Sequence, residues 1–297
     1  MTHPQALFQK QYGTSQFPFG LSHFERGMTD GRSDGSDAMF YLHWHSGTEI
    51  IMIHAGQGII VINGREISVE HGQAVFVNGG ELHSGFYQKS MPCQCSAMTF
   101  NPGMLHFNTN DICQQEYITP FLHGNYRIPT HIKGEIEWEK RILTAIQDII
   151  LAYDVHEKGY ELKVKILLYE ILLELIRQDQ YYPVEEINQY KQQATSRIKK
   201  IVSFIEDNCS SRIYIAELAE LAGISKRGFF KFFKSMTGRT PIDYINSCKV
   251  NIAANLLNES DKSILDISIE CGFESVGYFI KVFRKYKNCT PRTYRNM

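Results

Sequence analysis

The side chains with the plainest chemistry in this sequence are basic ones, and they gather in two short segments near the C-terminal end. A helix over residues 225–236 carries on its outward face Lys226, Arg227, Phe230, Lys231 and Lys234. A helix over residues 275–286 carries on its outward face Gly277, Tyr278, Ile280, Lys281 and Arg284. Basic side chains donate hydrogen bonds to guanine edges and phosphates, and apolar atoms contact thymine methyl groups. The two segments therefore have the chemistry of helices that read DNA, with Arg227 as the best candidate for a base contact.

A second set of polar side chains lies in the N-terminal half. In the segment from Tyr41 to His45, His43 and His45 alternate with Leu42 and Trp44, so an extended strand places both imidazoles on one face. Imidazole, carboxylate and aromatic side chains that converge inside a small barrel suit hydrogen bonds to hydroxyl groups and stacking on a ring. The N-terminal half is therefore expected to bind a small molecule.

The elements that must position the basic segments form an internal duplication. Residues 215–223 recur at 264–272, and residues 225–244 recur at 275–294. In each copy a short apolar helix ends at Gly223 or Gly272, and Ser225 or Ser275 follows at the N-cap position of the next helix. A helix, a short turn with glycine and a second helix make a helix-turn-helix. The C-terminal third is expected to hold two such units, and a helical bundle with a solvated basic face is the alternative.

The N-terminal half has the pattern of a β-barrel followed by helices. Short β-branched runs with regular turn signals over residues 38–100 indicate an antiparallel barrel or jelly roll, in which Asn63-Gly64 is the turn of a hairpin. From residue 135 the apolar period becomes that of two amphipathic helices. The stretch 178–193 is polar and contains Pro183, which is typical of an interdomain linker.

The C-terminal hundred residues resemble the DNA-binding domain of the AraC/XylS family of transcription regulators. The segments "IAELAELAGISKRGFFKFFKSMTGRTPIDYI" and "ILDISIECGFESVGYFIKVFRKYKNCTPRTYR" match its two helix-turn-helix units, and "KVNIAANLL" matches the helix that joins them. Lysines 231, 249 and 281 stand where the family usually has arginine, which keeps the charge but loses bidentate geometry. Asn288 stands where the family usually has glycine, and Phe230 replaces a small polar residue. The resemblance implies a double-stranded DNA partner.

The N-terminal half is similar to the two cupin motifs and, more closely, to the sensor domain of many AraC relatives. The motif residues are His43, His45, Glu49, Gly56, Gly72, Gly79, Gly80 and His83. In metal-binding cupins the three histidines and the glutamate ligate iron, manganese or zinc. In the AraC sensor domains the same positions line a pocket for a small effector, often a sugar, and usually hold no metal.

The resemblance implies an effector site made of His43, His45, Glu49, His83, Tyr41, Trp44 and Asn78. No cofactor and no metal is expected; His43, His45, Glu49 and His83 are the ligand set if a metal binds. Plain structural hydrogen bonding among these side chains is a further alternative. The helices are expected to contact DNA through Ser225, Lys226, Arg227, Phe230, Lys231, Lys234, Ser275, Gly277, Tyr278, Ile280, Lys281 and Arg284.

Composition narrows the class of protein. The chain has 297 residues, 43% hydrophobic, and a net charge of −1, which excludes a disordered chain. The most apolar stretch is too short and too charged for a membrane span, and the first residues lack the features of an export signal. The seven cysteines are scattered without a CxxC pair, so a reduced, cytoplasmic setting is expected. Residues 194–297 carry 17 basic against 10 acidic side chains, which suggests that this end meets a polyanion.

The sequence thus predicts an α+β protein with two domains. Residues 1–180 form a cupin-like effector-binding and dimerisation domain, with the barrel at about 15–130 and helices at about 135–180; residues 181–193 form a linker, and residues 194–297 the double helix-turn-helix. The expected function is a regulator, not an enzyme, that responds to a sugar and controls carbohydrate-utilisation genes; an activator would also contact RNA polymerase. The alternatives are a metal-binding cupin enzyme fused to a DNA-binding domain and a ligand-independent regulator.

Two further expectations concern assembly and switching. A homodimer is expected to use apolar residues of the two helices, namely Trp138, Ile142, Ile146, Ile149, Leu162, Ile166, Leu172 and Leu173. The alternative is that both helices only cover the open end of the barrel. Bound effector is expected to order the polar loop at 27–37 together with Phe17-Pro18-Phe19, whose aromatic rings would close over the pocket.

Overall fold

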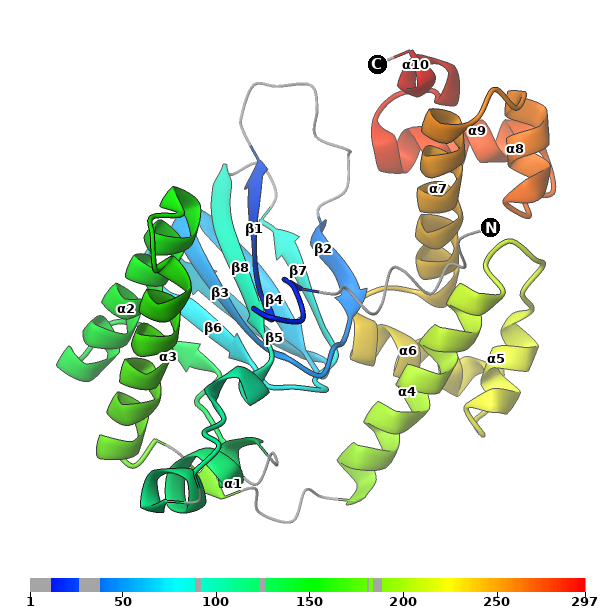
Figure 1. Cartoon of the computed structure of the whole chain (residues 1–297). Helices are drawn as coiled ribbons and strands as arrows, with labels where there is room; N and C mark the ends of the chain where they lie inside the picture. Colours follow the sequence, from blue (N-terminus) through cyan, green and yellow to red (C-terminus); the bar gives the residue numbers. More distant parts are fainter. Residues whose placement is uncertain are drawn as a thin grey trace.

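The computed structural model describes residues 12–26, 38–88, 92–109, 111–122, 126–180, 182–183 and 189–296. A two-sheet β-structure is followed by helices, which confirms the predicted α+β class (Figure 1). The strands are β1 (Phe19–Arg26), β2 (Ala38–His43), β3 (Thr48–Ala55), β4 (Gln57–Ile62), β5 (Arg65–Glu70), β6 (Ala74–Val77), β7 (His83–Tyr87), β8 (Cys93–Phe100), β9 (Tyr126–Arg127), β10 (His131–Ile132) and β11 (Tyr182–Pro183). The α-helices are α1 (Thr119–Leu122), α2 (Glu137–Val155), α3 (Tyr160–Arg177), α4 (Gln189–Asp207), α5 (Ile215–Leu221), α6 (Lys226–Thr237), α7 (Pro241–Glu259), α8 (Ile264–Glu270), α9 (Val276–Lys287) and α10 (Pro291–Arg295), with a short 3-10 helix at Pro102–Leu105 and a short π-helix at Gln114–Ile118.

Two antiparallel sheets form the barrel. One sheet has the strand order β1-β8-β3-β6-β10, and the other has the order β2-β7-β4-β5. The predicted hairpin is present, because Ile62 pairs with Arg65 across Asn63 and Gly64, both of which have positive φ. Apolar residues from both sheets, such as Ile51, Ile53 and Ile60, fill the space between them.

The opposite face of the five-stranded sheet is covered by α2 and α3 (Figure 1). Strand alternation explains this layering: Ile50 and Met52 of β3 point toward the helices, while the neighbouring odd-numbered residues point into the barrel. Phe17 and Phe19 also pack on this side, with ring centroids 5.8 Å from Tyr160 and 5.3 Å from Tyr153 respectively. The prediction that these phenylalanines close over the effector pocket is therefore wrong. The loop at 27–37 lies outside the described residues.

The helices α2 and α3 use much of their apolar surface for this core. Ile142, Ile146 and Ile149 are buried in it, Trp138 packs against it, and Leu172 of α3 is buried as well. These residues of the predicted dimer surface are consequently not available to a second copy. Exposed apolar residues do remain on the outer side, and they are Leu151, Val155, Leu162, Ile166 and Leu173.

The predicted linker is shorter than its polar composition indicated. Tyr182 and Pro183 form β11, which pairs with β9 of the N-terminal half, and α4 begins at Gln189 rather than near residue 194. Residues 181 and 184–188 lie outside the described part of the chain. The first residues of α4 are polar and resemble a linker in composition. Its buried apolar residues begin only at Ile198.

The C-terminal part contains both predicted helix-turn-helix units, α5–α6 and α8–α9, joined by α7. The Ser225 hydroxyl accepts a hydrogen bond from the backbone N–H of Gly228, and the Ser275 hydroxyl accepts one from Tyr278, so both serines cap their helices. Each unit has its own core, built around Phe229 and Phe233 in the first and around Phe279 and Phe283 in the second. Asn288 ends α9 with a φ of 54°, the left-handed cap for which asparagine can replace glycine.

Candidate effector site and DNA-binding surface

The four motif residues converge inside the barrel on one carboxylate oxygen. Nε2 of His45 and Nε2 of His83 each lie 2.8 Å from Oε2 of Glu49, and Nε2 of His43 lies 3.9 Å from the same atom. Their ligating atoms all lie within 4.8 Å of one another. His43 of β2 pairs with His83 of β7, the alternation of β3 turns Glu49 into the barrel, and His45 lies in the connection between β2 and β3. Glu49 and His83 are buried, whereas His43 keeps partial exposure.

The outer nitrogens of two of these imidazoles are fixed by the backbone. Nδ1 of His45 lies 2.9 Å from the carbonyl oxygen of Gly47, and Nδ1 of His83 lies 2.8 Å from that of Glu81. A carbonyl oxygen only accepts hydrogen bonds, so each Nδ1 carries a proton and each Nε2 faces the carboxylate. The same arrangement, with a backbone carbonyl behind the ring, orients histidines that ligate metals.

The electrostatics of the cluster favour an ionised Glu49. Burial raises the pKa of this carboxyl group, but the charges of His83 and His43 and the hydrogen bonds from His45 and His83 outweigh burial and hold the pKa well below its ordinary value. Burial lowers the pKa of His83, and the charge and hydrogen bond of Glu49 outweigh this, so that its pKa is raised. The site therefore favours an ionised carboxylate beside the protonated form of His83 in a buried environment.

The other predicted effector residues lie elsewhere. Trp44 points away from the cluster, toward Lys199 of α4, whose Nζ is 5.6 Å from the centroid of the indole ring. The backbone N–H of Asn78 donates to the Glu81 carboxylate in the turn before β7. The side chain of Tyr41 lies outside the described atoms. Trp44 and Asn78 are thus placed beside the barrel wall and not with the histidines.

One residue beside the histidine cluster, Tyr12, belongs to none of the sequence motifs. The ring of Tyr12, before β1, lies edge-on to His45 with a centroid distance of 5.9 Å. A Cβ on Gly47 would lie 2.4 Å from the Tyr12 hydroxyl oxygen and 2.7 Å from the backbone carbonyl oxygen of Phe100, and the backbone contact restricts this position to glycine. No spacing in the sequence connects Tyr12 to the histidines, because the contact depends on how the chain runs before the first strand.

The predicted DNA-contacting residues lie on the outside of α6 and α9. The exposed members are Ser225, Lys226, Arg227, Lys231, Lys234, Ser275, Gly277, Tyr278, Ile280, Lys281 and Arg284. Phe230 is half-buried, while Phe229 and Phe279 on the opposite faces are fully buried. The structure therefore leaves both basic faces accessible, as a surface that reads DNA requires.

Comparison with known proteins decides the family. Residues 31–172 match the AraC-like ligand binding domain, and residues 218–297 match a helix-turn-helix domain. The chain belongs to the AraC family of DNA-binding transcriptional regulators. It is 24% identical over 86% of its length to the uncharacterized HTH-type transcriptional regulator YdeC of Bacillus subtilis (86% of that protein is covered), and 26% identical over 87% of its length to the HTH-type transcriptional activator RhaS of Escherichia coli strain SE11 (88% covered).

Solved structures of other regulators give a looser match. ToxT from Vibrio cholerae O395 is 13% identical with a TM-score of 0.42, covering 94% of this chain and 97% of that one. The DNA-binding domain of AdpA, solved with a target DNA, is 29% identical with a TM-score of 0.32 and covers 34% of this chain and 90% of that one. Among the described residues, no helix is both long and apolar enough to cross a membrane.

In this AraC-family chain the sensor domain and the first helix-turn-helix share a hydrophobic core. Leu42 and Leu82 of the barrel belong to the same buried cluster as Ile198 of α4, Leu218 of α5 and Phe229 of α6. The DNA-binding part thus packs on the side of the four-stranded sheet, while α2 and α3 cover the other sheet (Figure 1).

Polar and backbone contacts extend this interface. Lys199 of α4 donates a hydrogen bond from Nζ to the carbonyl oxygen of Gly80. The guanidinium of Arg239, just after α6, lies 5.4 Å from the centroid of the Phe86 ring. A Cβ on Gly64, at the tip of the β4–β5 hairpin, would lie 2.3 Å from the carbonyl oxygen of Ser235, so only glycine allows this close approach.

Proposed function

We propose that this chain is a cytoplasmic, homodimeric transcription regulator, not an enzyme, whose sensor domain binds a small hydroxylated effector of the sugar class at His43, His45, Glu49 and His83. The effector acts on DNA binding through the first helix-turn-helix, and the regulated genes serve carbohydrate use. Imidazole and carboxylate groups give donors and acceptors suited to hydroxyl groups, which supports a sugar as the class of effector.

One observation carries the coupling between site and DNA. The cluster residues alternate in sequence with residues of the domain interface: Leu42 precedes His43, Trp44 precedes His45, and Leu82 precedes His83. Successive side chains of an extended segment point to opposite faces. A ligand that moves one of the imidazoles therefore also moves the adjacent residue, which packs against α4 to α6. The ligand would then bind one arrangement of the two domains better than another, as a switch requires.

The experiment compares effector binding with DNA binding. Calorimetry of the full chain against a panel of mono- and disaccharides should find one that binds, and Glu49→Gln should abolish that binding while affinity for DNA is retained. Glu66→Gln, at an exposed carboxylate of β5, is the matched control and should behave like the unchanged protein. Binding of the sugar to Glu49→Gln with unchanged affinity would remove the cluster from the effector site.

A divalent transition metal is the second candidate ligand, favoured by the orientation of the imidazoles. With Nδ1 of His45 and His83 protonated, a hydrogen bond to ionised Glu49 needs a second proton on each ring, whereas a metal needs only the Nε2 lone pairs. Three imidazoles and a carboxylate suit zinc, iron or manganese. Such a site fits the alternative of a metal-binding cupin, with or without catalysis.

Metal binding has its own readout. Elemental analysis of the purified chain should give about one metal per chain, and loading of metal-free protein should release protons because the metal displaces those on Nε2. His83→Ala should lose the metal, and His106→Ala, at an exposed histidine, should keep it. Absence of metal after purification and no proton release on addition of zinc would contradict a metal site.

The homodimer is proposed to form through the exposed side of α3. Leu162, Ile166 and Leu173 have exposed fractions of 64, 48 and 45%, and their spacing places them on one face of the helix. Leu151 and Val155 of α2 extend this apolar surface next to the turn between the helices. A two-fold axis would pair the surface with its own copy.

Sedimentation of the full chain at micromolar concentration should show a dimer, and Leu162→Glu should convert it to a monomer. Leu265→Glu changes an equally apolar exposed residue of α8 in the DNA-binding part and should leave the dimer intact. A dimer that survives Leu162→Glu and Ile166→Glu together would place the interface elsewhere.

A further inference from the structure

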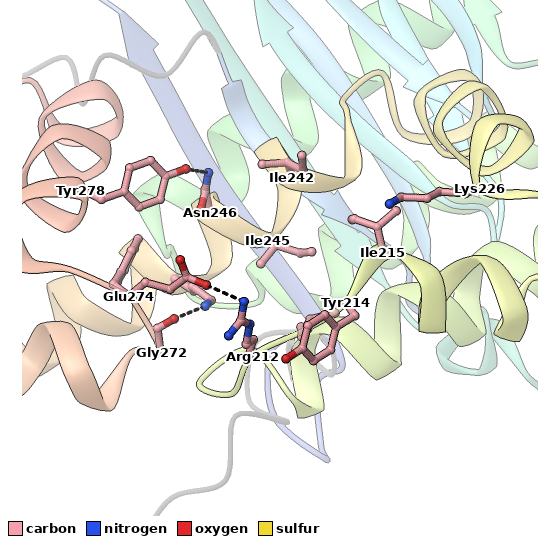
Figure 2. A pocket seen from close by; sticks show the side chains of 13 residues that line it. Arg212, Tyr214, Ile215, Lys226, Ile242, Ile245, Asn246, Gly272, Glu274 and Tyr278 are labelled. Carbon is pink, nitrogen blue, oxygen red and sulfur yellow. Dashed lines mark hydrogen bonds and ion pairs between the residues drawn. The ribbon is translucent and has the colours of Figure 1, made fainter.

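A cleft of about 350 Å³ separates the two helix-turn-helix units (Figure 2). Its walls come from the loop before α5, the first half of α7 and the turn before α9. Lys226, in the first turn of α6, and Tyr278, in the first turn of α9, both line it. Because both residues also belong to the predicted DNA-contacting faces, the cleft lies between the two helices that are expected to enter the grooves.

Two interactions span the cleft. The guanidinium of Arg212, before α5, forms an ion pair of 3.1 Å with the carboxylate of Glu274, before α9, and the side chains are 67 and 75% exposed. The Asn246 amide of α7 donates a hydrogen bond of 3.1 Å to the Tyr278 hydroxyl (Figure 2). An exposed ion pair in water contributes little to stability, so Arg212 can exchange its partner at small cost.

The charge of the lining favours an anion. Arg212, Lys226 and Lys249 stand against Glu274 as the charged groups of the cleft. The Arg212 guanidinium lies over the Tyr214 ring at 5.0 Å, which holds it at the surface. Lys249 is already engaged by the carbonyl oxygen of Gly272, so Arg212 and Lys226 are the groups that face an incoming ligand.

The geometry of duplex DNA identifies the occupant. Helices that enter successive major grooves lie about one helical turn apart, and the phosphodiester backbone runs between those grooves. Contacts to phosphates fix the register of a protein on DNA without reading sequence. We propose that this cleft seats the DNA backbone between the two half-sites, and that Arg212 leaves Glu274 to bind a phosphate there. The inference rests on DNA binding by this chain and adds a contact outside the recognition helices.

The test measures how affinity depends on salt, with mixed-sequence duplexes of about 30 base pairs that cover more than two helical turns. Arg212→Ala should reduce the slope of log affinity against log salt by about 0.9, the value for one phosphate contact, and weaken all duplexes alike. Arg212→Lys should restore most of the slope, because the charge is kept. Glu274→Gln should bind several-fold more tightly than the unchanged chain, since Arg212 no longer has to leave a charged partner.

Matched controls separate the cleft from net charge. Lys140 and Glu137 form an exposed ion pair on α2, on the far side of the barrel from the DNA-binding part. Lys140→Ala and Glu137→Gln make the same charge changes and should leave the slope unchanged. Suppose that the unchanged chain binds DNA but Arg212→Ala keeps the full salt slope or loses affinity for one sequence only. The proposed binding of the DNA backbone in the cleft would then be wrong, while the proposed regulator function would stand. Failure of the unchanged chain to bind any duplex would instead contradict the proposed function.

Discussion

The two helix-turn-helix units share one repeated sequence pattern but pack against different parts of the protein. The first unit shares its core with Leu42 and Leu82 of the sensor domain. The core of the second unit, around Phe279 and Phe283, contains only residues from α7 onward within the described chain. The same sequence pattern thus produces one unit whose core includes residues of the sensor domain and one unit whose core is built on α7 and whose contact with the first unit includes the Arg212–Glu274 ion pair.

This difference indicates which part of the DNA-binding domain a change in the sensor domain can reach directly. A change in the barrel reaches α4, α5 and α6 directly, whereas it reaches α9 only through α7 and the contacts across the cleft. Coupling between two sites needs an element whose arrangement both of them bias. We expect the effector to alter the first reader and to leave the second reader's own fold unchanged.

The largest expected effect comes from emptying the two cores. Phe229→Ala and Phe279→Ala each remove a fully buried ring and should each lower the free energy of unfolding by about 3–5 kcal/mol. Only Phe229→Ala should also disturb Trp44, which packs against the first core. Denaturant unfolding followed by Trp44 fluorescence, with Trp138→Phe in the background, distinguishes the two. Equal fluorescence changes in both variants would mean that the units are not separately anchored.

A buried carboxyl group makes the first unit sensitive to pH. Burial raises the pKa of Glu206 to about 9, although the Tyr244 hydroxyl, 2.6 Å away, opposes this rise. Because the folded pKa exceeds the unfolded one, the folded state holds a proton that the unfolded state releases, and stability falls as pH rises from about 4.5 to 9. Glu206→Gln should remove this slope and stabilise the folded state by up to about 5 kcal/mol at pH 8.

The measurement is the free energy of unfolding from pH 5 to 9. Glu220→Gln, at an exposed position of α5, is the control and should follow the unchanged chain. A slope that persists in Glu206→Gln would assign the pH dependence to another group.

The smallest expected effect concerns what each helix reads. Arg227 of α6 and Gly277 of α9 occupy the same place in the duplication, so only the first helix offers a bidentate donor there. Arg227→Ala should cost about 1–3 kcal/mol on the preferred sequence and relax discrimination at one position. A Cβ on Gly277 meets no atom within 4 Å, so Gly277→Ala should change affinity little. Selection from random duplexes, compared for the two variants, measures both; unchanged selectivity of Arg227→Ala would exclude its base contact.

The sequence predicts the local structure well because turns and periods are local signals. Asn63-Gly64 specified its hairpin, the duplication specified two helix-turn-helix units, and Asn288 took the left-handed cap. The spacing of His43, His45, Glu49 and His83 also sufficed to bring them together. Whether they bind a sugar or a metal stays a prediction.

The errors concern which neighbour covers a given face. A period shows which side of a strand or helix is apolar but not which element covers that side, so the sequence places Trp44 in the pocket although it faces the DNA-binding part. The helical period likewise predicts Ile142, Ile146 and Ile149 in a dimer interface, whereas the five-stranded sheet covers them. Tyr12 reaches His45 through the path of the chain, which no spacing records.

The short strand β11 has a consequence for how tightly the two domains must bind each other. Its pairing with β9 fixes the chain to the sensor domain at Pro183, and only five residues separate Pro183 from the start of α4 at Gln189. A tether this short gives the second domain an effective concentration on the order of millimolar, so an interface with an intrinsic Kd of roughly 100 µM is closed about nine-tenths of the time. Proteolytic cleavage between Pro183 and Gln189 should therefore turn a docked pair into two fragments that separate on dilution. The interface between the two domains can thus be weak enough for a small effector to open it and still be closed when no effector is bound.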